Sequence, residues 1–188
     1  MLAPVLVTPP TDLPITLEEA KLHLRVSHDE EDGLIENLIR AATQHVDGWT
    51  GVLGRAVMPQ TWRQDFDGWS CLRLLLNPVR EIESVTYRDS DGNQQTLDPA
   101  AYALRADGGG AYVDLAPGQS WPAVASRVDA ISVTYEAGYD EAPAPVRQAM
   151  LLLIGHWYDN RQATIVGTNA TEVPLAVDAL LSPYRRVA

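Results

Sequence analysis

Cysteine and lysine each occur only once in this 188-residue sequence, at Cys71 and Lys21. A single cysteine excludes an internal disulfide and a metal site built from several thiolates. We interpret Cys71 as a buried structural thiol, because it begins an apolar run that is typical of a strand.

Long apolar runs are also missing from the sequence. The longest dense run, residues 149–155, is far shorter than the ~20 apolar residues that a membrane-spanning helix requires, so we expect no membrane contact. The first ten residues, MLAPVLVTPP, lack the basic start of a secretion signal, and prolines interrupt their apolar stretch. We therefore do not expect secretion.

Basic residues are scarce. The chain has 14 Lys and Arg residues against 25 Asp and Glu residues, which gives a net charge of -11 at pH 7. A protein that grips nucleic acid needs many cations to neutralise phosphates, so the composition argues against that function. An acidic wall past which DNA slides without specific binding is compatible with it, because like charges repel.

The pattern of apolar residues predicts an α+β fold. Helical periodicity covers about residues 13–54 and 145–182, and short strand-like runs lie between them, at about 56–137. We expect a single domain over residues 1–188. It has a helical core, made of an N-terminal helix pair and C-terminal helices, an inserted antiparallel β-sheet or sandwich of about five to seven strands, and a tail at 183–188.

The first helical segment has clear start signals. Thr16 and Glu19 form a T-x-x-E capping box, so a short helix should begin there and end near Val26. A second helix should begin in the acidic residues 29–32, where carboxylates favour the positive end of the helix dipole. Its apolar stripe is spaced by three and four residues and consists of Leu34, Ile35, Leu38, Ile39, Ala42, Val46 and Trp49.

The strands and the C-terminal helices are predicted from the same kind of apolar periodicity. Strands are expected at 61–66, 71–76, 82–87, 102–105, 111–115 and 128–136, with Ile131, Val133 and Tyr135 on one face. A helix is expected at 146–161, with Pro145 in its first turn, and a short apolar helix at 173–181.

A search for catalytic and metal-binding patterns yields little, and we expect no catalytic residue, metal or cofactor. The four histidines lack metal-pair spacing. Asp89, Asp91 and Asn93 resemble a calcium loop, but the glycine and the final acidic ligand are misplaced, so a hairpin turn is favoured. His156 and Asp159 are three residues apart on one helix and could form an acid–base pair, but a helix-packing histidine is the favoured interpretation of His156.

Several stretches, in chain order, resemble the head–tail connector (adaptor) proteins of long-tailed bacteriophages and phage-derived gene transfer agents. They include PITLEEAK, WTG and MPQTW. The full set lies at residues 14–26, 34–42, 49–51, 58–62, 77–79, 82–87, 134–139, 145–150, 156–158 and 179–185. Each motif also has an ordinary structural explanation. Taken together, in this order, the motifs span nearly the whole chain.

The resemblance implies a structural subunit without catalytic activity. Such proteins form a ring of about a dozen neighbouring copies beneath the portal protein, receive neck or tail-side proteins, and let DNA pass. They assemble in the bacterial cytoplasm and end in the neck of the virion or phage-like particle. Their C-terminal segment docks on the portal, which assigns portal binding here to Leu181, Ser182, Pro183, Tyr184, Arg185 and Arg186. Compact members lack the strand-rich insertion.

Apolar helical faces would supply the contacts between copies. The stripes at 34–49 and 146–158 could provide both core and interface, and we select Leu34, Leu38, Trp49 and Trp157 as subunit-interface candidates. The tail suits an anchor because Tyr and Arg are enriched at interface hot spots, although a frayed solvated terminus is the alternative.

Two other functions remain open from the sequence. The chain could be a small-molecule-binding or hydrolytic enzyme with a cleft near His156, using Asp159 and Glu136. It could also be an adaptor-like fold that acts elsewhere, as a tail terminator or a regulatory partner.

Overall fold

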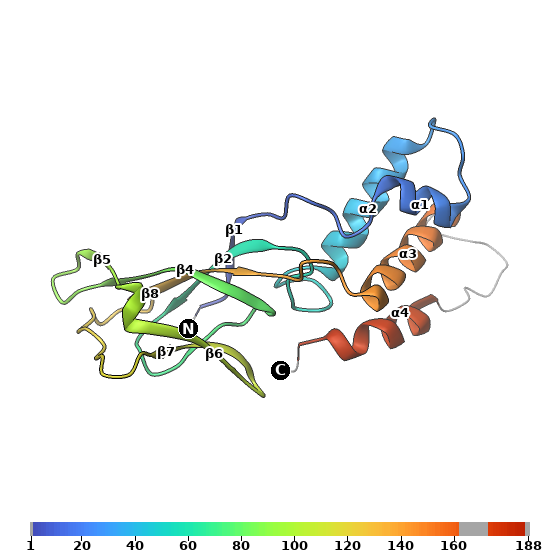
Figure 1. Cartoon of the computed structure of the whole chain (residues 1–188). Helices are drawn as coiled ribbons and strands as arrows, with labels where there is room; N and C mark the ends of the chain where they lie inside the picture. Colours follow the sequence, from blue (N-terminus) through green and yellow to red (C-terminus); the bar gives the residue numbers. More distant parts are fainter. Residues whose placement is uncertain (1, 162–172, 187–188) are drawn as a thin grey trace. The chain divides into compact units, whose positions relative to one another are not determined.

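The computed structural model describes residues 2–161 and 173–186. The chain divides into two compact units, each made of two sequence segments. The β unit consists of Met1–Thr11 and Pro59–Tyr139, and the helical unit consists of Asp12–Met58 and Asp140–Ala188 (Figure 1). The mixed α+β class predicted from the sequence is confirmed.

The β unit contains two antiparallel sheets. The larger sheet has the strand order β1-β2-β8-β4-β5, and the smaller has the order β3-β7-β6. The larger sheet is formed by β1 Val5–Thr8, β2 Gln60–Phe66, β8 Ile131–Ala137, β4 Val79–Arg88 and β5 Gln94–Thr96. The smaller is formed by β3 Leu72–Arg73, β7 Gly110–Leu115 and β6 Tyr102–Asp107, which follows the short 3-10 helix η1 Pro99–Ala101. The described strands outnumber the five to seven that were expected, because β1 and β5 were not predicted.

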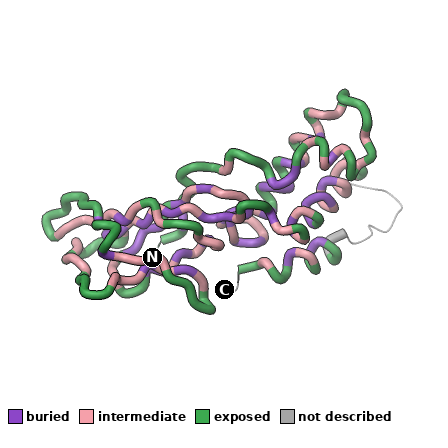
Figure 2. Tube along the Cα trace, in the orientation of Figure 1, coloured by how far each residue is buried: buried purple, intermediate pink, exposed green. Residues whose placement is uncertain are grey.

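The central strand β8 carries the core of the β unit. Its residues alternate strictly between buried and half-buried, and Ile131, Val133 and Tyr135 are fully buried, as the sequence pattern predicted. Figure 2 shows buried residues in purple along the strands of this unit, interrupted by half-buried residues in pink. Burial raises the pKa of the Tyr135 phenol.

A polar network lies inside this core. The Gln64 side chain accepts a hydrogen bond from the Leu75 amide and donates one to the Arg73 carbonyl, both at 3.0 Å. The Tyr135 hydroxyl donates to Gln64 at 3.4 Å. These bonds satisfy buried polar groups where β2 faces the segment after β3.

Cys71 is exposed, so the prediction of a buried structural thiol is wrong. The run at 71–76 does alternate, but the buried members are Leu72, Leu74 and Leu76. A period of two places odd-numbered positions on the outer face, and Cys71 falls on that side. Only Leu72–Arg73 of the run pairs as a strand.

The turn between β4 and β5 confirms the hairpin interpretation of the acidic loop. One Asp89 oxygen accepts the amide hydrogens of Asp91 at 3.0 Å and Asn93 at 2.9 Å, and Gly92 has a φ of 84°. Across the described residues, no group of three or more His, Cys, Asp and Glu side chains is placed to hold a metal ion.

The helical unit is formed by α1 Leu17–Leu24, α2 Asp32–Val46, α3 Ala144–Asp159 and α4 Val173–Leu181, followed by the 3-10 helix η2 Ser182–Tyr184. Half of the predicted capping box is present, because the Glu19 amide donates to Thr16 Oγ1 at 3.1 Å. The Glu19 carboxylate instead pairs with Arg147 of α3 at 2.8 Å. No helix in the described ranges has the length and apolar character needed to cross a membrane.

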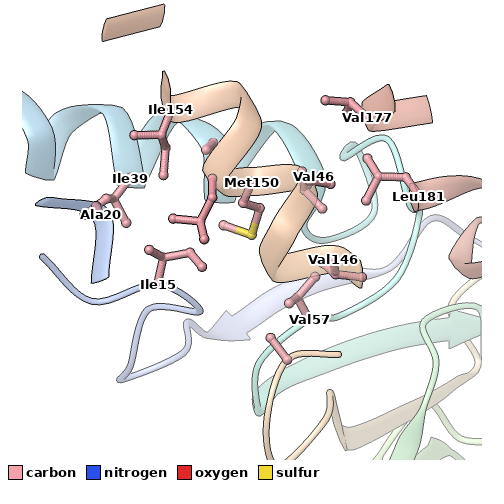
Figure 3. Packing of buried hydrophobic residues seen from close by; sticks show 14 of the residues in the cluster. Ile15, Ala20, Ile39, Val46, Val57, Val146, Met150, Ile154, Val177 and Leu181 are labelled. Atoms are coloured by element: carbon pink, nitrogen blue, oxygen red, sulfur yellow. The ribbon is translucent and has the colours of Figure 1, made fainter. Parts of the chain in front are cut away.

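The core of the helical unit lies between α2, α3 and α4. Buried residues of α2 are Ile35, Ile39, Ala42, Thr43 and Val46. The four apolar ones pack with Met150 and Ile154 of α3 and with Val177 and Leu181 of α4 (Figure 3). Each buried Ile, Val, Leu and Met side chain of this core contributes about 1.5–3 kcal/mol by leaving water.

The helix α2 ends three residues before the predicted stripe does. Asp47 caps its C-terminus with extended backbone, and the Asp47 side chain accepts the Val57 amide at 2.6 Å. Trp49 therefore lies in the loop after α2 and not on its buried face.

Candidate functional site: assembly surfaces of the helical unit

The C-terminal segment, defined here as Leu181–Arg186, folds back on its own unit. Leu181 is 1% exposed and belongs to the core, whereas Ser182, Pro183, Arg185 and Arg186 are exposed and Tyr184 is half-buried. Residues 187 and 188 of the expected tail lie outside the described residues. The segment therefore combines one buried anchor with an exposed, partly aromatic surface.

Three contacts hold the end of this segment. The Arg186 guanidinium stacks on the Trp49 ring, 4.1 Å from its centre, and the Arg186 amide donates to the Leu53 carbonyl at 2.9 Å. Arg185 pairs with Asp178 of α4 at 2.5 Å. As far as Arg186, the segment makes these contacts with its own unit.

The four interface candidates differ in their surroundings. Leu34 and Leu38 flank the buried stripe of α2 and are half-buried, and Leu38 packs against the core. Trp49 is half-covered by Arg186. Trp157 of α3 is half-buried and makes an edge-to-face contact with His45, with ring centres 6.1 Å apart. Each keeps exposed apolar surface, and contact with another chain is untested for all four.

An apolar groove lies beside the C-terminal segment, and its lining includes His156, near which the enzyme hypothesis placed a cleft. It has a volume of about 340 Å³. Its walls come from the end of α2 and the loop after it, from α3, and from α4. The lining residues are His45, Val52, Leu153, His156, Trp157, Val177, Asp178, Leu181 and Arg185. The sequence gives little indication of this set of lining residues, because they come from three separate segments.

Of the residues named in the enzyme hypothesis, His156 alone is among those that line the groove. His156 lines the groove and lies 3.3 Å from the Asn160 amide nitrogen. Asp159 is exposed and is not among the lining residues. Glu136 belongs to β8 of the β unit, where it pairs with Arg80 at 3.0 Å.

Ion pairs fix the connection between α1 and α2. Lys21 bonds Asp29 and Asp32, each at 2.6 Å, and these hydrogen bonds raise the pKa of Lys21. Glu31 accepts hydrogen bonds from Tyr158 and from Arg161, the latter at 2.6 Å. The hydrogen bonds from Tyr158 and Arg161 lower the pKa of Glu31. These pairs join the connection to the end of α3.

The described side chains thus offer packing surfaces: a groove, half-exposed aromatics and an anchored C-terminal segment.

The chain belongs to the head completion protein family, whose model matches residues 14–187. Its role is that of a structural head–tail connector protein of phage-like particles. A search of curated proteins finds no match.

Solved structures of gene transfer agent (GTA) particles contain chains with the same fold. A chain in the neck of an empty GTA particle, computed with C6 symmetry, has a TM-score of 0.74 and 21% sequence identity. A chain in the virion of a native GTA particle has a TM-score of 0.76 at the same identity. Both alignments cover 100% of this chain and 97% of the other. A chain in the neck of a native GTA particle, computed with C12 symmetry, has a TM-score of 0.64.

Proposed function

We propose that this protein forms a ring of about a dozen copies between a portal protein and the neck or tail-side proteins of a phage-like particle. The observation that carries the proposal is the family match over nearly the whole chain. It is supported by the shared fold with chains from GTA necks that were solved with C6 and C12 symmetry. The subunit acts by packing, assembles in the bacterial cytoplasm and ends in the particle neck.

Charge supports a passive role toward DNA. A net charge of -11 gives a subunit that repels phosphates overall, so a ring of such subunits would let DNA pass without retaining it.

The portal contact is assigned to the exposed part of the C-terminal segment. Leu181 fixes the segment to the core, and Ser182, Pro183 and Arg185 present exposed surface next to the half-buried Tyr184. Tyr and Arg side chains contribute strongly to interfaces when a partner desolvates them.

The test is the affinity of the full chain for the portal protein encoded beside it, measured by sedimentation. The double variant Tyr184→Ala with Arg185→Ala should bind at least tenfold more weakly, which corresponds to about 1.4 kcal/mol. The matched control is Tyr112→Ala with Arg105→Ala, which removes the same side-chain types from the β unit. It should bind as the unmodified chain does.

Urea unfolding of both double variants would verify that they fold. An unchanged affinity of the folded Tyr184/Arg185 variant would remove the C-terminal segment from the portal contact. No binding by any form, including the unmodified chain, would contradict the connector assignment itself.

A further inference from the structure

The C-terminal segment is fixed at both of its ends. Leu181, at its start, is 1% exposed and belongs to the core of the helical unit. Arg186, at its end, contacts the loop after α2 through both its backbone and its side chain. Between these two points lie the exposed residues Ser182, Pro183 and Arg185, to which the portal contact is assigned. The conformation of that surface therefore depends on how firmly Arg186 is held.

Three residues of the loop hold Arg186. Its guanidinium stacks on the Trp49 ring, 4.1 Å from the ring centre, and its amide donates to the Leu53 carbonyl at 2.9 Å. Gly54 lies against the same side chain, because a Cβ added there would be 3.4 Å from the Arg186 Cβ and 3.7 Å from the guanidinium carbon. We call Trp49, Leu53 and Gly54 the Arg186 clamp.

The clamp is tied to the same core as the start of the segment. Leu53 is 2% exposed, and its amide donates to the Val46 carbonyl at the end of α2 at 3.2 Å. The Gly54 amide donates to the Gly51 carbonyl at 3.0 Å, and Gly54 has a φ of 59°, which favours glycine. Val46, Leu53 and Leu181 belong to one buried cluster. Both ends of the segment are thus attached to a common support.

We propose that the Arg186 clamp positions the C-terminal segment for portal binding, with Trp49 and Arg186 as positioning residues that do not touch the portal protein. This inference rests on the proposed function. A segment already held in its bound conformation loses less conformational freedom on association, so it binds more tightly than the same residues released from the clamp. An exposed cation–π contact shifts an equilibrium by about threefold to tenfold, which sets the size of the effect.

Substitutions of the two stacked residues give the first measurement. The affinity of the full chain for portal protein should fall about threefold to tenfold in Arg186→Ala and in Trp49→Ala. The double variant should bind no more weakly than the weaker single variant, because both substitutions remove one contact. Trp49→Phe keeps an aromatic face and should restore part of the affinity. Losses that add in the double variant would overturn the clamp.

Arg40→Ala is the matched control for these variants. Arg40 is also an exposed arginine of the helical unit, but it pairs with Glu36 of its own helix at 3.2 Å. Its substitution should leave the portal affinity unchanged. Circular dichroism and urea unfolding would verify that every variant compared is folded.

A disulfide in place of the stacked pair separates positioning from direct contact. In a Cys71→Ser background, Gly54→Cys with Arg186→Cys would bring two Cβ atoms to 3.4 Å. This separation is close to the short end of the range of about 3.5–4.5 Å found in disulfides. The oxidised full chain should bind portal protein as tightly as the unmodified chain, although it lacks the arginine. Reduction should lower its affinity about threefold to tenfold. Gly54→Cys alone, in the same background, should not respond to reduction.

The outcomes separate the clamp from the connector function. An oxidised variant that binds as weakly as Arg186→Ala would show that Arg186 itself contacts the portal, and it would overturn the positioning role. Tighter binding after reduction would show that the segment has to leave its own unit, which also overturns it. In both cases the unmodified chain still binds, and the connector function stands. Absence of portal binding in every form, the unmodified chain included, would contradict the connector function and this inference with it.

Discussion

At the scale of single residues, the best-defined electrostatic interaction joins β3 to the β6–β7 hairpin. Arg73 donates two hydrogen bonds to the Asp107 carboxylate, both at 2.8 Å, and the Gly109 amide adds a third at 2.8 Å. The hydrogen bonds from Arg73, followed by that from Gly109, lower the pKa of Asp107 from 3.8 to about 2. A two-pronged Arg–carboxylate contact of this kind favours the ionised acid.

This pKa shift predicts a pH-dependent loss of stability. Asp107 stays ionised in the folded protein down to about pH 2, whereas it takes up a proton near pH 4 when unfolded. Its contribution is therefore present above about pH 4 and lost as the pH falls through about 2. Urea midpoints of the unmodified chain and Asp107→Asn should differ at neutral pH and converge toward pH 2.

The partner variant serves as the control for this prediction. Arg73→Gln removes the cation that lowers the pKa of Asp107. Its urea midpoint should therefore also differ from that of the unmodified chain at neutral pH and converge with it toward pH 2. A gap between the unmodified chain and Asp107→Asn that stays constant from pH 7 to 2 would contradict the account.

The burial of individual residues was only partly predictable. Ile131, Val133 and Tyr135 were predicted correctly because strict alternation over a long central strand leaves one choice of face. Cys71 was placed wrongly because the whole apolar run was taken as buried, whereas its alternation puts Cys71 on the same outer face as Arg73.

At the scale of elements, the loop after α2 is a tight structure that supports both assembly surfaces. It folds back on the helix end through hydrogen bonds from the Val52 amide to the His45 carbonyl at 2.9 Å and from Leu53 to Val46 at 3.2 Å. Val52 lines the groove, and Leu53 holds the backbone of Arg186. The loop is close-packed at Gly51, where an added Cβ would lie 2.2 Å from the Asp47 carbonyl oxygen.

The substitution Gly51→Ala should therefore destabilise the helical unit. The Cβ would meet backbone, which cannot rotate away, so the loop must shift at a cost of about 1–3 kcal/mol. Chemical unfolding followed by far-UV circular dichroism measures the change. Gly33→Ala is the control, because nothing lies within 4 Å of that position.

The control should respond in the opposite direction. Gly33 is in the first turn of α2, and replacing a helical glycine by alanine stabilises by up to ~1 kcal/mol. If Gly51→Ala were as stable as Gly33→Ala, the close packing described for this loop would be wrong.

Elements with a strong period were predictable, and short or evenly exposed ones were not. The helix at 173–181 was predicted with the bounds observed for α4. The strand β1 escaped prediction because all four of its residues are exposed, so it has no alternation. The strand β5 is three polar, exposed residues and forms through its hairpin with β4.

At the scale of the whole molecule, the sequence did not predict which unit the N-terminal segment Met1–Thr11 joins. Residues before position 12 belong to the β unit, although they precede the first helix in the sequence. Strand pairing between Leu6 and Trp62 is a long-range contact that local patterns do not encode. The division of the chain into a single connector domain with an insertion stays a prediction.

The assembly surfaces were predictable only in part. The sequence selected Trp157 and the C-terminal segment by residue type, and both border the groove. The groove itself brings together residues from positions 45 to 185, so it exists only once the helices pack. Contact of these surfaces with other chains remains a proposal.

Electron microscopy of the chain mixed with its neighbouring portal protein tests the central claim most directly. Class averages of the complex, compared with portal alone, should show an added closed ring on one end of the portal, with about a dozen copies. A chain ending at Ser182 should lose that density if the C-terminal segment forms the portal contact. Portal particles without added density, in the presence of a folded full-length chain, would contradict the assignment as a connector.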